Sequence, residues 1–218
     1  IKNFLKKILH LLGYNLSINW NTRYQQLGKN SIYDSNTLKA DDQERITVSQ
    51  IKLYAKIINN LTKNDKLKNI LDFGCGIGRH FTFLSNLNSV KKGSNIFGYD
   101  PTELLLSHAS KQEYTKLYSS PEFSQKFDLI FCHMVLGGLQ ANQINKTIEL
   151  MIGSLSKKGI IFLVEATGEE NIEYNPWKIR KKDEYMPQDL GIIWTHEQNI
   201  QESGQYLSII IGKRNREN

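Results

Sequence analysis

The stretch "ILDFGCGIGRH", residues 70–80, joins a short apolar run to three glycines that alternate with other residues. The glycines are Gly74, Gly76 and Gly78. Glycine tolerates backbone angles and close approaches that side chains forbid. We therefore expect a strand that ends in a tight loop, with a helix beginning after the loop. Because a helix N-terminus carries free N–H groups, this corner would favour an anionic ligand group.

Strand-like and helix-like segments alternate along the rest of the chain. Strand patterns occupy residues 69–74, 95–100, 114–118, 127–135 and 160–166, and helical patterns occupy 44–62, 78–87, 102–112 and 142–156. This alternation indicates right-handed crossovers and a parallel sheet. Two last strands, 190–198 and 205–214, are joined by too short a segment for a crossover, so we expect them to pair antiparallel. The predicted fold class is α/β: a Rossmann-like, seven-stranded, mostly parallel sheet with one antiparallel strand near the edge and helices on both faces.

The length of 218 residues fits one domain with a core and a small appendage. We expect an N-terminal helix and cap or lid over residues 1–45, and a main domain over residues 46–218. Residues 14–43 are polar and read as a loop-like segment. Residues 1–13 follow an amphipathic helical pattern; we favour packing on the main domain over contact with a membrane or partner.

The overall composition says less about partners and location than the motifs say about the fold. The net charge is +6, which allows an anionic partner but identifies none. No run approaches the roughly 18–20 apolar residues of a membrane span. The two cysteines, Cys75 and Cys132, make no disulfide framework, so we expect a reducing, cytoplasmic location.

The glycine spacing excludes two common nucleotide loops. A phosphate loop would close with Gly-Lys-Ser/Thr, and a dinucleotide fingerprint would have glycine where Arg79 stands. The pattern is instead acid-x-Gly-x-Gly-x-Gly, beginning at Asp72. Asp100 ends the second strand, 22 residues (100 − 78) after Gly78, where a carboxylate can accept from both hydroxyls of a ribose. The alternative for Asp100 is a cap on the following helix.

Four blocks in order carry a family resemblance: "ILDFGCGIGRH" (70–80), "IFGYDPT" (96–102), "FDLIFCHMVLGGL" (127–139) and "KKGIIFLVEA" (157–166). Together they resemble class I S-adenosylmethionine-dependent methyltransferases, of the bacterial small-molecule or saccharide type. The resemblance covers roughly residues 66–214. It implies S-adenosyl-L-methionine as cofactor, and no metal.

The resemblance also implies roles for individual residues. The backbone of the glycine loop, Gly74, Cys75, Gly76 and Gly78, would pass close to the amino-acid end of the cofactor, and Asp72 would hold its ammonium group. Asp100 would bind the ribose. The residues expected near the adenine are Pro101, Thr102 and Ser119 or Ser120. His133, near the end of the fourth strand, would border the methyl group and the substrate.

A hydroxyl acceptor must lose a proton on methylation, which a general base of near-neutral pKa assists. The two candidate catalytic residues are His133 and Glu165, at the ends of the fourth and fifth strands. Each has a structural alternative: His133 as a hydrogen-bonded core histidine, and Glu165 as a purely structural acceptor. Cys132 lies within an apolar strand and is interpreted as a core residue.

Nucleic-acid acceptors are disfavoured, because "CHMVLG" (132–137) lacks the Asn/Asp-Pro-Pro-aromatic motif of base-amine methyltransferases and no stacking surface is evident. We therefore favour a small-molecule or saccharide acceptor with an oxygen nucleophile. The alternatives are an RNA or protein methyltransferase and a non-catalytic module that binds S-adenosylmethionine. Six aromatic residues would serve as a lid, a carbohydrate platform or simple anchors: Trp20, Tyr24, Tyr33, Tyr174, Trp177 and Tyr185.

Overall fold

The computed structural model describes residues 19–28, 31, 40–169, 172–174, 177–188, 190–200 and 206–214. The helix that we expect over residues 1–13 lies outside these ranges, and so does Tyr33. The helices are α2 (Trp20–Leu27), α3 (Ala40–Leu61), α4 (Phe81–Ser85), α5 (Glu103–Ala109) and α6 (Ala141–Ser154), with 3₁₀ turns η2 (Leu136–Gly138) and η3 (Lys182–Tyr185). The strands are β1 (Leu67–Phe73), β2 (Val90–Tyr99), β3 (Lys116–Tyr118), β4 (Phe127–His133), β5 (Leu155–Thr167), β6 (Ile172–Tyr174), β7 (Trp177–Ile179), β8 (Ile192–Ile200) and β9 (Tyr206–Arg214).

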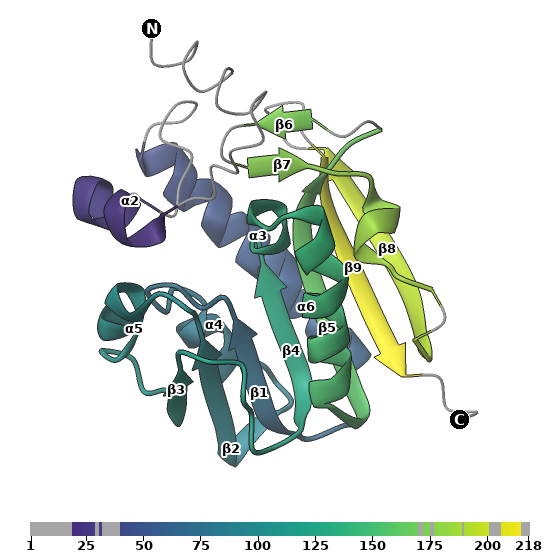
Figure 1. The fold of residues 1–218 in the computed structure, drawn as a ribbon. Helices are drawn as coiled ribbons and strands as arrows, with labels where there is room; N and C mark the ends of the chain where they lie inside the picture. The colour runs from purple at the N-terminus through teal and green to yellow at the C-terminus, as the bar shows by residue number, and fades with distance from the viewer. Residues whose placement is uncertain are drawn as a thin grey trace, which may run out of the picture.

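Seven strands form one sheet in the order β3-β2-β1-β4-β5-β9-β8. Strands β1 to β5 pair in parallel, and β9 pairs antiparallel with both β5 and β8. This confirms the predicted fold, with β9 as the one reversed strand, next to the edge (Figure 1). The strand order reverses between β1 and β4, which is where open α/β sheets bind ligands.

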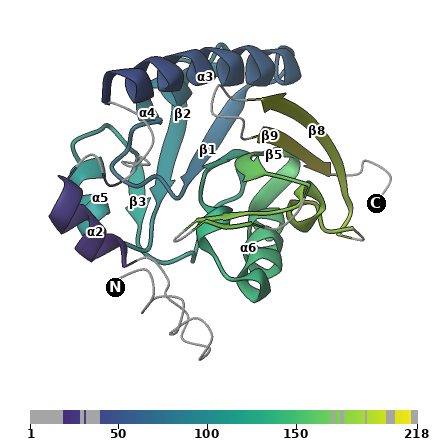
Figure 2. The ribbon, with the colours of Figure 1, turned by 90° about the horizontal axis from the view of Figure 1, so that it is seen from above.

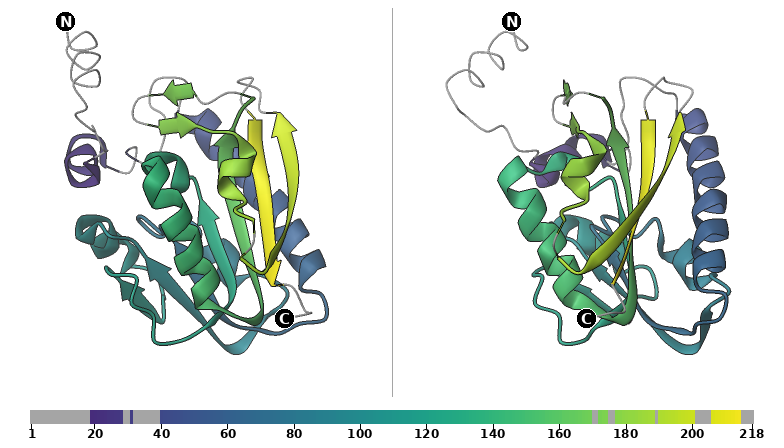
Figure 3. Two further views of the ribbon diagram at one scale, coloured as in Figure 1. Left: turned by 45° about the vertical axis from the view of Figure 1, so that its right-hand side comes forward. Right: turned by 90° about the vertical axis from the view of Figure 1, so that its right-hand side faces the viewer.

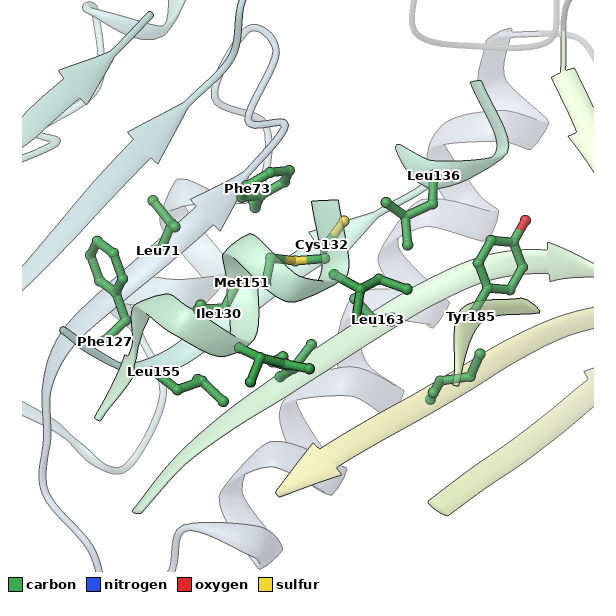
Figure 4. Packing of buried hydrophobic residues seen from close by; sticks show 14 of the residues in the cluster. Leu71, Phe73, Phe127, Ile130, Cys132, Leu136, Met151, Leu155, Leu163 and Tyr185 are labelled. Carbon is green, nitrogen blue, oxygen red and sulfur yellow. The ribbon is translucent and has the colours of Figure 1, made fainter. Parts of the chain in front are cut away.

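Helices α3 and α6 cover opposite faces of the sheet (Figures 2 and 3). On one face, Tyr54 and Ile58 of α3 pack with Phe131 and Phe162 of the sheet. On the other face, α6 packs on the alternate strand residues; Figure 4 shows Met151 of this helix close to Cys132. Because strand side chains alternate between faces, the two apolar clusters are built from neighbouring residues of the same strands.

Three parts of the structure differ from the sequence-based expectation. Residues 20–27 form α2, although the polar segment 14–43 was expected to be a loop. Asn19 caps this helix by accepting from the Thr22 N–H at 3.0 Å, and none of its residues is buried, so no apolar period marks it. The polar insert, residues 168–189, for which no strand was expected, contains the small β6–β7 hairpin. Finally, α4 begins only at Phe81, because Gly78 has a φ of +82° that a helix cannot include.

Helix α3 is continuous across residue 45, where the boundary between the N-terminal segment and the main domain is expected. Within the described ranges, no helix combines the length and apolar character needed to cross a membrane.

Candidate active site

The loop that follows β1 is fixed by backbone hydrogen bonds to the neighbouring strand. The N–H groups of Gly74 and Cys75 both donate to the Tyr99 carbonyl oxygen, at 2.7 and 2.9 Å. The Gly78 N–H donates to the Cys75 carbonyl oxygen at 2.9 Å and closes the turn. The chain therefore turns sharply at the carboxyl edge of the sheet, beside the point where the strand order reverses.

The three glycines of this loop have positive φ angles but different surroundings. A Cβ atom added at Gly74 would lie 2.3 Å from Cγ2 of Val135, and one added at Gly78 would lie 3.1 Å from Cγ of Gln112. Gly74 and Gly78 are thus glycines partly because the protein packs closely against them. A Cβ added at Gly76 would meet nothing within 4 Å, so Gly76 alone of the three faces open space.

Asp100, directly after β2, joins this loop to α5. Its Oδ2 accepts from the Gly76 N–H at 3.1 Å, and its Oδ1 accepts from the Thr102 N–H at 2.8 Å. Burial raises the pKa of Asp100, and the two N–H donors partly oppose this effect. The Thr102 side chain is a third hydrogen-bond donor to Asp100. A carboxylate can accept about four hydrogen bonds, so acceptor capacity remains for a further donor.

The other residues expected around the cofactor lie near this corner with different exposures. Thr102 is buried at the start of α5, whereas Pro101 is exposed. Ser119 and Ser120, directly after β3, are both exposed. Cys75 is buried in the glycine loop, and burial raises the pKa of its thiol.

Asp72, one residue before the end of β1, is buried beneath the glycine loop. The Tyr114 hydroxyl donates to its Oδ2 at 2.7 Å, and Nδ1 of the buried His80 lies 3.9 Å from its Oδ1. Burial raises the pKa of Asp72 to about 7, while the Tyr114 hydrogen bond and the positive charge of Arg79 lower it. This carboxyl group therefore changes charge close to neutral pH.

His133, the last residue of β4, is held through both ring nitrogens. Its Nδ1 lies 2.8 Å from a guanidinium nitrogen of Arg79, and its Nε2 lies 3.3 Å from the Tyr54 hydroxyl. Because a guanidinium group can only donate, Nδ1 must be the acceptor and Nε2 carries the proton of the neutral ring. Burial, followed by the charge of Arg79, lowers the pKa of His133 well below its usual value.

Glu165 lies on the opposite face of the sheet from His133. Its neighbour Val164 belongs to the apolar cluster on the α3 side, and successive strand residues point to opposite faces, so Glu165 points to the other face. Glu165 is completely buried. Its two oxygens accept three backbone hydrogen bonds, from Val135 at 2.8 Å, Leu136 at 2.7 Å and Gly137 at 3.1 Å. Burial raises the pKa of Glu165 to about 7, against the effect of these donors. This arrangement favours the structural alternative for Glu165, as an acceptor that holds the loop after β4.

The loop after β4 begins with a backbone conformation that is rare for a side-chain-bearing residue. Met134 has a φ of 55°, and its N–H donates to the Val164 carbonyl oxygen at 2.8 Å. Strained residues of this kind persist where surrounding contacts fix them, and they are frequent at functional sites. Met134 lies between His133 and the three residues, Val135, Leu136 and Gly137, whose N–H groups donate to Glu165.

Three residues of this site were not among the sequence-based candidates: Tyr54, Arg79 and Tyr114. Arg79 was considered only as the residue that breaks a dinucleotide fingerprint, although its place directly after the last glycine marked it as close to the loop. Tyr54 comes from α3 and lies 79 residues from its partner His133. No group of three or more His, Cys, Asp or Glu side chains suited to a metal ion occurs within the described part of the chain.

Of the aromatic residues expected to form a lid or platform, Tyr24 and Tyr185 can be placed in detail. The ring centroids of Tyr24 and His108 lie 4.8 Å apart, so this contact joins α2 to α5. Tyr185 is fully buried in the apolar cluster that also contains Met151 of α6, so it anchors η3 and presents no surface to a ligand.

Comparison with known proteins supplies independent observations. A family model described as a methyltransferase domain matches residues 47–196. The structure of the plantazolicin methyltransferase BpumL, in complex with a pentazolic desmethylPZN analog and SAH, matches with a TM-score of 0.62 at 16% identity, over 90% of this chain and 97% of that chain. Magnesium protoporphyrin IX methyltransferase from Synechocystis PCC 6803, with bound SAM, matches with a TM-score of 0.61 at 14% identity, over 94% and 96%.

A third similar structure carries a different activity in its name. The cyclase SpnF matches with a TM-score of 0.61 at 11% identity, over 75% of this chain and 80% of that chain. No curated protein matches the chain in sequence. At these identities the structural matches establish a shared fold.

Proposed function

The chain belongs to the methyltransferase-domain family, and from this premise we propose that it transfers a methyl group from S-adenosylmethionine to an oxygen atom of a small molecule or saccharide. The observation that carries this proposal is the corner between β1 and β2. There the open space at Gly76 adjoins a buried carboxylate, that of Asp100, which accepts a hydrogen bond from the Gly76 N–H and can accept a further donor.

The residues of this corner fit S-adenosylmethionine. Gly76 leaves room for a group to approach the backbone, and Asp100 offers oxygens for the two ribose hydroxyls. Asp72 supplies a second carboxylate for the ammonium group, and its pKa of about 7 makes this contact dependent on pH. When bound, the cofactor supplies an activated methyl group on a sulfonium, so the protein's main task is alignment.

We propose His133 as the residue that borders the acceptor. Its low pKa keeps the imidazole neutral, which is the form that can accept a proton. Its lone pair on Nδ1 is already used by Arg79, so a role as general base requires this contact to open when the acceptor binds. Glu165 is proposed as a positioning residue, because its oxygens are occupied by the loop that follows His133.

The names of the matched structures support a small organic acceptor. The plantazolicin and magnesium protoporphyrin IX methyltransferases are named for natural-product and tetrapyrrole substrates. The cyclase SpnF is named for a reaction other than methyl transfer. A second candidate for this chain is therefore a non-catalytic module that binds S-adenosylmethionine. The two candidates differ in one product, since only a methyltransferase releases S-adenosylhomocysteine.

Isothermal titration calorimetry with S-adenosylmethionine tests the binding step. We expect Asp100→Ala to weaken binding by roughly 100-fold, because hydrogen bonds to a charged group contribute about 1.5–3 kcal/mol each. Asp65→Ala, which removes an exposed carboxylate, is the matched control and should bind as the wild type does. Equal affinities for all three proteins would remove Asp100 from the site.

A second assay tests the reaction. S-adenosylhomocysteine release is measured with panels of hydroxyl, amine and thiol acceptors, and the proposal expects turnover with hydroxyl compounds. Turnover restricted to amines would overturn the oxygen assignment. Tight cofactor binding with no product from any panel would favour the non-catalytic candidate.

A further inference from the structure

Basic side chains gather at the edge of the sheet opposite the candidate active site. This basic edge is formed by residues 62–68, 86–94, 124–128, 154–159 and 213–214, where β1, β2, β4 and β5 begin and β9 ends (lower side of Figure 1). Its ten basic residues are Lys63, Lys66, Lys68, Lys91, Lys92, Lys126, Lys157, Lys158, Lys213 and Arg214. Its two acidic residues are Asp65 and Asp128.

The charge of the chain is distributed very unevenly. Ten basic and two acidic residues give the basic edge a formal charge of +8, whereas the whole chain carries +6. All other residues together therefore carry −2, and the net positive charge of the protein comes from this edge alone. One of its two acids, Asp128, is already engaged, because it accepts from the Lys68 and Asn69 N–H groups and from the Ser156 hydroxyl.

Local contacts account for only a few of these cations. Lys126 donates to the Gly153 carbonyl oxygen at 2.5 Å, and Arg214 donates to the Ile152 carbonyl oxygen at 2.8 Å, both near the end of α6. Lys91 donates to the Asn88 carbonyl oxygen at 2.5 Å. Cations near a helix C-terminus are favoured by the helix dipole. Within the part of the chain that the structure describes, none of the ten basic residues forms an ion pair with a carboxylate.

The composition of the basic edge argues against two kinds of partner. Stable protein interfaces are enriched in aromatic residues and arginine and depleted in lysine, whereas nine of the ten cations here are lysines. Binding of single-stranded nucleic acid uses exposed aromatic rings, and the one aromatic residue of these segments, Phe127, is buried. A surface of point charges without stacking groups suits a diffuse layer of negative charge.

We propose that the basic edge binds the surface of an anionic membrane. Each basic side chain near such a surface strengthens binding by roughly fivefold. Ile193 is 56% exposed and pairs with Lys213 in the β8–β9 register, so an apolar side chain stands next to the cations at the bilayer interface. Bound in this way, the protein holds its candidate active site away from the bilayer, and the acceptor reaches the site from the aqueous side.

Vesicle co-sedimentation of the full chain tests the proposal independently of catalysis. Phosphatidylcholine vesicles with and without about one third phosphatidylglycerol are compared at low and physiological salt. The wild-type protein should bind the anionic vesicles, more weakly at higher salt. The variant K91Q/K92Q/K157Q/K158Q should lose on the order of 100-fold in affinity, corresponding to three or more effective charges.

The matched control is K52Q/K56Q/K111Q/K146Q, which removes four exposed lysines outside the basic edge. Both variants keep residues 1–18, so any contribution of that segment is common to them, and thermal unfolding checks that both are folded. Equal losses in the two variants, or equal binding of neutral and anionic vesicles, would overturn the proposal. Tight binding of an RNA oligonucleotide without vesicle binding would also overturn it and assign the basic edge to nucleic acid.

Discussion

Replacement of Gly74 by alanine tests the close approach between the glycine loop and the loop after β4. Gly74 has a φ of +73°, and the new Cβ would lie 2.3 Å from Cγ2 and 3.2 Å from Cγ1 of Val135. Two costs follow: an unfavourable backbone conformation and a steric overlap. The structure allows them to be measured separately, because Gly76 has a positive φ of +55° with no neighbour within 4 Å.

The backbone cost for a residue with a Cβ at positive φ is about 1–2 kcal/mol. Overpacking adds roughly 1–3 kcal/mol, so Gly74→Ala should lower the free energy of unfolding by about 2–5 kcal/mol. Gly76→Ala should show only the backbone cost. For a chain of this size, 1 kcal/mol corresponds to roughly 2–4 °C in Tm, which predicts a decrease of roughly 5–15 °C for Gly74→Ala.

The assay is thermal unfolding of a double-mutant cycle with Val135→Ala, which removes both overlapping methyl groups. We expect Gly74→Ala/Val135→Ala to be less destabilised than the sum of the two single variants, by about the overpacking cost. The reasoning is refuted if the double variant shows simple additivity, or if Gly76→Ala is destabilised as strongly as Gly74→Ala.

Three further predictions concern the charges of the site. Tyr114→Phe removes a hydrogen bond that lowers the pKa of Asp72, so this pKa should rise above about 7. The affinity for S-adenosylmethionine should then reach its plateau at a higher pH than in the wild type. Calorimetry from pH ~6 to ~9 measures this shift. Arg79→Gln keeps a donor but removes a charge that lowers the pKa of His133, so this pKa should rise, as followed by NMR of the imidazole protons. Glu165→Gln replaces an acceptor oxygen by a donor and should lower the free energy of unfolding by about 2 kcal/mol.

Each of these predictions has a control and a contrary result. Tyr118→Phe removes a hydroxyl that donates to Gln125, away from Asp72, and should leave the pH dependence unchanged; a similar shift in both tyrosine variants would contradict the first prediction. An unchanged histidine pKa in Arg79→Gln would contradict the second. Unaltered stability of Glu165→Gln would show that the three N–H donors do not depend on a carboxylate.

Stability should also depend on pH through the two buried acids. The folded-state pKa values of Asp72 and Glu165 are about 7, above the unfolded values near 4. Their contribution to stability is therefore fully present below pH ~4 and is lost as the pH rises through ~7. The variant Asp72→Asn should have a flatter pH dependence of the unfolding free energy between pH ~5 and ~8, and an identical slope would contradict the raised pKa.

The seven strands and the one reversed strand near the edge could be predicted because they depend on local patterns. Buried strands such as 127–133 are continuous apolar runs, and short connections limit how the last two strands can pair. The family resemblance rests on four short blocks of sequence in order along the chain, and it too is confirmed. The segments that were missed lack such patterns: α2 buries no residue, and the β6 and β7 strands have three residues each.

In the candidate site, too, the local features could be predicted and the long-range contacts could not. The glycines and Asp100 were predicted from one loop and one spacing, and their roles toward the cofactor stay predictions. The contacts of His133 with Arg79 and Tyr54 join residues 54 and 79 positions apart, so they depend on how the glycine loop and α3 pack on the sheet. The three N–H donors to Glu165 come from a loop that begins with Met134 at a positive φ, and no sequence pattern predicts this conformation.

The central claim is that the corner between β1 and β2 binds an adenosyl cofactor. A crystal structure of the chain with S-adenosylhomocysteine tests it most directly. The account predicts the ribose hydroxyls within hydrogen-bond distance of the Asp100 carboxylate, with the cofactor against the backbone of Gly76. Density for the ligand elsewhere, or no ligand in well-ordered crystals that leave this corner open, would contradict the account.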